Sequence, residues 1–159
     1  MPCCDLLICT KQLAISLEDL KDDGNTETAS MATQILNTVT KSDFVISLFM
    51  LKSLFSLTLP LNKHLQKVDS DLSEACSNVE NIADVVKKWR SNVEQKFSSI
   101  FSSAKSTLES VNSEITTPLA SACSVHGSNI QLNTAEEYYR MSTYIPVLDD
   151  SSAQLQERF

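Results

Sequence analysis

The sequence predicts an all-α protein, an elongated helical bundle forming a single domain with one long helix. Three observations support this fold class. The 159 residues include two glycines and four prolines, which are too few for the tight turns that join antiparallel strands. Most segments repeat their apolar residues at the 3.6-residue period of an α-helix. One apolar run, 44–59, is longer than a strand and rich in leucine.

Two helices are expected in residues 1–42, because leucine, isoleucine, methionine and valine recur there at helical spacing. Polar residues around Gly24 separate them, and Gly24 is expected to take the C′ position of the first helix. Thr26 or Thr28 is the expected N-cap of the second.

The run Asp43–Leu65 is the most apolar stretch of the chain. It predicts a buried central helix within 43–68, kinked at Pro60. Its apolar residues cover nearly the whole circumference of a helix, which is typical of a helix surrounded by others. A membrane span is not expected, because Lys52 near the middle would cost about 3 kcal/mol in a bilayer. We expect Lys52 instead to extend its ammonium group to the surface.

Residues 70–115 are predicted to form the long helix of the bundle. Their apolar and small residues recur about every 3.6 residues, the period of a straight helix rather than that of a left-handed coiled coil. A break at the serine cluster 98–103 is the alternative.

The carboxyl-terminal part is divided between a loop and a last helix. Residues 116–133 contain a proline and a glycine and show no period, which predicts a loop. Thr134 matches a capping box with Glu137 and therefore opens a final helix, 134–159, kinked at Pro146.

The charge and the cysteine content indicate which partners and which cellular compartment to expect. The net charge is −7 and the sequence pI is about 4.7, so the chain alone is expected to bind nucleic acid weakly or not at all. An odd number of irregularly spaced cysteines is typical of free thiols in a reducing compartment, so an intracellular location is expected. The cysteines are Cys3, Cys4, Cys9, Cys76 and Cys123.

No catalytic or metal-binding constellation is evident. Cys123 and His126 have the spacing of a ligand pair, but a zinc site needs about four ligands, and Cys76 and His64 are far away in sequence. The chain has no Gly-x-Ser-x-Gly elbow, no phosphate-binding loop and no glycine-rich dinucleotide turn. We therefore expect no metal, no cofactor and no enzymatic activity.

Two small basic patches are the candidate phosphate or DNA contacts. Charged residues of this kind are more commonly a solvated helix face, and this alternative stays open. The first patch is Lys63, His64 and Lys67, and the second is Lys87, Lys88 and Arg90.

Several short motifs follow one another in a fixed order: Asp43–Leu48, Thr58–Leu61 with Leu65–Gln66, Glu136–Arg140, Ile145–Asp149 and Gln154–Phe159. In order and spacing they resemble the hAT superfamily of DNA transposases and its domesticated relatives. The resemblance is greatest to the zinc-finger MYM-type 1-like group and the group of the repressor of the inhibitor of the protein kinase. The motif residues are Pro60, Glu137, Tyr139, Arg140, Pro146, Asp149, Arg158 and Phe159.

The resemblance implies that the chain corresponds to the helical insertion of an RNase H-like transposase. The family's Asp-Asp-Glu metal triad would lie outside it, so no catalytic residue is carried over. It also implies a nuclear protein with a binding role, whose partner is another protein or the remainder of a transposase core. Leu119 and the neighbours of His126 depart from the family pattern. A free-standing helical protein–protein interaction module of cellular function is the alternative.

Overall fold

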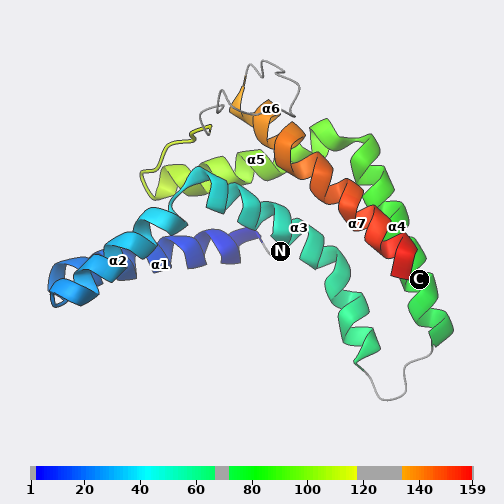
Figure 1. Ribbon diagram of the computed structural model, residues 1–159, viewed down its shortest axis with the longest axis horizontal. Coiled ribbons are helices and arrows are strands. Elements are labelled where there is room, and N and C mark those ends of the chain that lie inside the picture. Colours follow the sequence, from blue (N-terminus) through cyan, green and yellow to red (C-terminus); the bar gives the residue numbers. More distant parts are fainter. Residues whose placement is uncertain (1–2, 67–71, 118–133, 159) are drawn as a thin grey trace. The chain divides into compact units, whose positions relative to one another are not determined.

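The computed structural model describes residues 3–66, 72–117 and 134–158 (Figure 1). These residues form helices and short irregular segments without any strand, which confirms the all-α class. Contacts divide the chain into two compact units, whereas the sequence predicts one domain. The first unit combines Met1–Phe49 with Phe101–Asn129, and the second combines Met50–Ile100 with Ile130–Phe159.

The first unit begins with the two helices predicted for residues 1–42, α1 (Cys3–Asp23) and α2 (Thr26–Val39), which lie side by side in Figure 1. The predicted N-cap of α2 is wrong. Asn25 caps this helix, and its Oδ1 accepts a hydrogen bond of 2.9 Å from the Thr28 N–H. Gly24 does not have a positive φ. It is required instead because a Cβ there would press against the Leu20 carbonyl oxygen.

One apolar cluster of this first unit joins α1 and α2. Leu17 of α1 packs with Ala32 and Val39 of α2. Ser42, at the start of α3 (Ser42–Leu65), is 2% exposed. Its Oγ donates to the Thr116 carbonyl at 3.0 Å and accepts from the Thr116 N–H at 3.2 Å. These bonds fix the segment after α5 against the start of α3.

The segment predicted as one long helix is two helices, α4 (Leu72–Ser91) and α5 (Val93–Ser110), and α5 continues through the serine cluster 98–103. The ribbon changes direction sharply between them (Figure 1). At the junction, Ser91 Oγ donates to the Lys87 carbonyl at 3.0 Å and Asn92 Nδ2 donates to the Lys88 carbonyl at 3.2 Å. Side chains that bond back to the preceding turn in this way bend helices.

Helix α5 ends at Ser110, before the predicted residue 115, because Asn112 has a left-handed conformation with a φ of 52°. The Ser113 N–H donates to the Leu108 carbonyl at 2.9 Å and the Asn112 N–H to the Glu109 carbonyl at 3.2 Å. This pair of bonds is the Schellman motif. Residues 113–117 are irregular, and the rest of the predicted loop 116–133 lies outside the described residues.

The last helical segment belongs to the second unit and begins as predicted. Thr134 Oγ1 accepts from the Glu137 N–H at 3.1 Å, and α6 (Ala135–Tyr139) follows. A π-helical turn, η1 (Arg140–Tyr144), then leads into α7 (Ile145–Arg158). This wide turn stands where the proline kink was predicted. In this turn the Ile145 N–H donates a hydrogen bond to the Arg140 carbonyl. The next residue, Pro146, has no N–H to donate.

The predicted burial of the central helix on all sides is wrong. Helix α3 continues through Pro60 to Leu65 without ending there. One set of its side chains is buried: Val45, Ile46, Phe49, Met50, Leu54 and Leu61. Another set is exposed by 40–63%: Phe44, Leu51, Phe55, Leu59 and Leu65. Within the described residues, the apolar stripes that pack on α3 are enough to cover one side of it.

Candidate interaction surface

In the second unit, α3 presents large apolar side chains to solvent. Phe55 is 63% exposed, Leu59 50%, and Leu51 and Leu65 43% each. Single exposed apolar residues are normal, but several on consecutive turns of one helix mark a binding surface. Covering these four side chains would remove several hundred Å² from water by ordinary side-chain areas.

A groove runs beside these residues, and we call it the α3–α7 groove. Its volume is about 460 Å³. Its floor is formed by Ile82 and Val86 of α4, which sit on the buried stripe of that helix. None of the described residues that line it is charged. The α3 wall is Leu51, Leu54, Phe55, Leu57, Thr58, Leu61, Asn62 and Leu65, and the α7 wall is Val147, Ser151, Gln154 and Leu155.

Helix α3 is, among the described residues, long and apolar enough to cross a membrane by length and composition. Of its most apolar stretch, 33% is buried inside the protein. Core helices of soluble proteins meet the same criterion, so this property alone does not identify a membrane segment.

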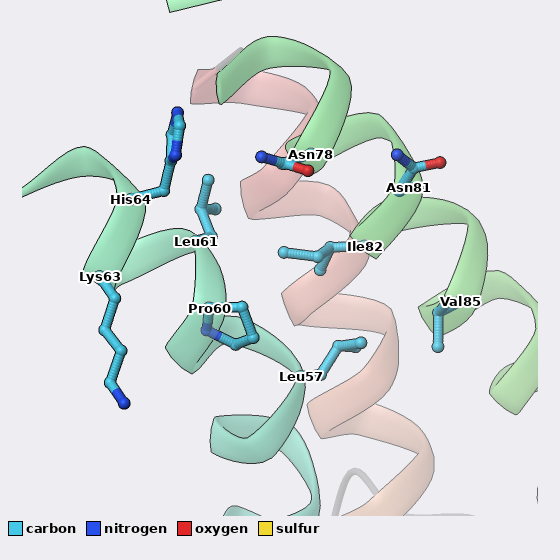
Figure 2. Close-up of a pocket in the computed structure, with 9 residues that line it drawn as sticks. All are labelled: Leu57, Pro60, Leu61, Lys63, His64, Asn78, Asn81, Ile82 and Val85. Atoms are coloured by element: carbon cyan, nitrogen blue, oxygen red, sulfur yellow. The ribbon is translucent and has the colours of Figure 1, made fainter. Parts of the chain in front are cut away.

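A second hollow of about 390 Å³ lies between α3 and α4 (Figure 2). Its wall is mostly apolar, and in Figure 2 Ile82 points from α4 toward α3 while the Lys63 side chain points away from α4. His64 Nε2 lies 3.5 Å from a Glu74 carboxylate oxygen, although this buried nitrogen makes no hydrogen bond within the described chain. Among the described residues, the lining of this hollow contains no serine, cysteine or acid.

Three of the predicted phosphate contacts lie next to carboxylates. Arg90 Nε lies 2.7 Å from Asp149 Oδ1, and Lys87 Nζ lies 3.9 Å from Asp84 Oδ1. With His64 beside Glu74, three of the five described candidates face an acid. Lys63 and Lys88 make no ion pair within the described residues, and Lys67 lies outside them.

The residues of the family motifs have structural roles in the second unit. Asp149 pairs with Arg90, and Arg140 lies 3.5 Å from Glu94. Tyr139 is buried and its ring meets Tyr138 edge-on at 5.2 Å. Pro60 lines the hollow of Figure 2, Glu137 donates its N–H to the Thr134 cap, and Pro146 is exposed. Arg158 ends α7, and Phe159 lies outside the described residues.

Sequence reasoning missed one buried polar group, Tyr144. Its side chain is completely buried against Phe97, with the ring centroids 5.2 Å apart. The hydroxyl has no hydrogen-bond partner in the described chain, and burial raises the pKa of Tyr144 to about 12. The residue lies outside the lining of the groove, so its effect is on stability.

Cysteine and histidine positions form no metal site in the described part of the chain, where no group of three potential ligands occurs. Cys9 and Cys76 are free and exposed. Cys123 and His126 lie outside the described residues.

Comparisons with known proteins do not identify a family for this chain. No protein-family model, no curated protein and no solved structure matches it.

Proposed function

We propose that this chain is a helical protein-interaction module that binds a helical partner along the α3–α7 groove. We further propose that it is a transposon-derived, hAT-like insertion without a catalytic triad, and that it acts in the nucleus. The observation that carries the proposal is the row of exposed apolar residues on α3 beside that groove. Grooves of this kind receive the apolar face of an amphipathic helix. The proposed surface fits either identity of the chain, a free-standing cellular module or a piece of a larger transposase-like protein.

Binding to protein is favoured over binding to DNA by the charges. The net charge is −7, and Arg90, Lys87 and His64 each face a carboxylate. Phosphate binding would require these basic groups to exchange their partners, whereas the apolar groove is available without any rearrangement. A membrane partner is disfavoured because Lys52 and Asn62 lie within the apolar part of α3.

An apolar dye tests whether the groove is open in solution. Phe55→Glu should reduce fluorescence of a dye such as anilinonaphthalene sulfonate, because it places a charge in the most exposed part of the surface. Ser56→Glu is the matched control, since Ser56 is the next residue, is exposed and does not line the groove. Equal dye binding by the two variants, with unchanged helical circular dichroism, would contradict the proposed surface.

A photoreactive phenylalanine analogue at position 55, introduced in cells, tests binding directly. A discrete adduct is expected from position 55 and none from position 56. The purified chain with metal and DNA ends should show no strand transfer, and robust strand transfer would refute the assignment as a module without catalysis.

A further inference from the structure

Helix α3 carries, in the second unit, the spacing of a helix-pairing seam. Leu51, Phe55, Thr58, Asn62 and Leu65 all line the groove and follow one another at alternating steps of four and three residues. Residues at these steps form one continuous stripe on a helix, and such a stripe packs against a second helix aligned with it. The occupant that best fits the stripe is therefore a helix of similar length.

We propose that this helix is α3 of a second copy of the chain, antiparallel to the first, with a two-fold axis at Thr58. The inference rests on the proposed function, because it names the partner that fills the α3–α7 groove. In an isologous dimer the same patch serves both copies. Residues equally far from Thr58 along α3 then face each other, so Leu51 meets Leu65 of the second copy.

The exposure of the stripe is complementary in this arrangement. Phe55, which protrudes with 63% exposure, faces Leu61 of the second copy, which is recessed with 7% exposure. Asn62, which is exposed, faces Leu54, which is 9% exposed. Parallel helices would instead place Phe55 against Phe55 and leave the recessed leucines facing each other. The antiparallel pairing therefore puts knobs into holes, as stable helix pairs do.

The groove also suits a copy of a highly charged chain. Each chain has a net charge of −7, so two copies repel unless their contact surfaces are neutral. No described residue that lines the groove is charged, and the α7 wall contributes the small Ser151 and the uncharged Gln154. Among the described residues, the dimer therefore buries no unpaired charge, and the amide of Asn62 lies one turn from the Thr58 hydroxyl of the second copy.

Single cysteines test this register in a background where all five natural cysteines are replaced by serine. Thr58→Cys should give a disulfide-linked dimer under mild oxidation, because equivalent side chains meet at a two-fold axis. Ser56→Cys is the control and should form no disulfide-linked dimer, since Ser56 lies roughly 160° around the helix from Thr58. A mixture of Leu51→Cys and Leu65→Cys should give the mixed dimer. Self-linkage of Leu51→Cys instead would overturn the antiparallel arrangement.

Sedimentation equilibrium of the unaltered chain provides the second measurement. The chain should be dimeric, Phe55→Glu should weaken dimerisation at least about tenfold, and Ser56→Glu should not change it. A chain that stays monomeric up to about 100 μM would overturn the proposal. The photoreactive probe at position 55 then distinguishes failure of the dimer proposal alone from failure of the proposed interaction function. An adduct with a different protein keeps the interaction function and rejects the dimer, whereas no adduct rejects both.

Discussion

Removing the hydroxyl of Tyr144 should make the protein more stable. The side chain is 0% exposed and its oxygen has no hydrogen-bond partner in the described residues. A buried polar group without a partner costs about 1–3 kcal/mol. Tyr144→Phe removes that cost and leaves a small void beside Phe97, so we expect a net gain of about 1 kcal/mol.

The gain should grow at alkaline pH. Burial raises the pKa of Tyr144 from 10.0 in the unfolded chain to about 12 in the folded protein. The group therefore leaves stability unchanged below pH 10, and stability falls as the pH rises from 10 to 12, because the unfolded chain loses its proton first. The loss reaches roughly 2–3 kcal/mol, and Tyr144→Phe abolishes it.

Urea denaturation at pH 7 and at pH 11, followed by circular dichroism, measures both effects. Tyr138→Phe is the matched control, because Tyr138 is only half-buried and should change stability by less than about 0.5 kcal/mol. If Tyr144→Phe were less stable than the unaltered protein at pH 7, the hydroxyl would have a partner and the argument would be refuted.

Substitutions at three positions test features of the first unit by urea denaturation. Ser42→Ala should cost about 1–3 kcal/mol because it removes the hydroxyl that serves the buried backbone of Thr116, and an unchanged midpoint would contradict this. Asn112→Gly should stabilise the protein by about 0.5–1 kcal/mol because glycine adopts a positive φ freely, whereas Asn112→Ala should destabilise it. An alanine variant more stable than the glycine variant would exclude the left-handed cap. Gly24→Ala should cost more than about 1 kcal/mol because its Cβ meets the Leu20 carbonyl, and a stabilised variant would show that this turn relaxes.

The all-α class and the capped start at Thr134 were predictable because they depend on local pattern. Scarce glycine and proline, a helical period and a threonine three residues before an acid are all visible in the sequence. The break at Asn92 was not, because the apolar period continues unchanged across it. The junction carries side-chain hydrogen bonds from Ser91 and Asn92 to the preceding turn, which periodicity does not report.

The candidate surface could be predicted only in part. The composition of α3 shows that it needs a partner, but not whether the partner lies in the same chain. One set of its side chains is buried, and residues such as Phe55 remain exposed. The ion pairs made by the basic patches could not be predicted, for a related reason. The acid that neutralises Arg90 is Asp149, which is 59 residues away in sequence and comes close only in the fold.

The π-helical turn η1 decides which way α7 faces. It contains one residue more per turn than an α-helix, so both Tyr139 and Tyr144, five positions apart, point inward. Deleting one residue from this turn would restore an ordinary helix and rotate everything after it by about 100°. Val147 and Leu155 would then swing out of the groove wall. The number of residues in this one turn thus sets the orientation of the α7 side of the groove. Insertions or deletions in the turn would change which partners bind, without replacing any residue that contacts them.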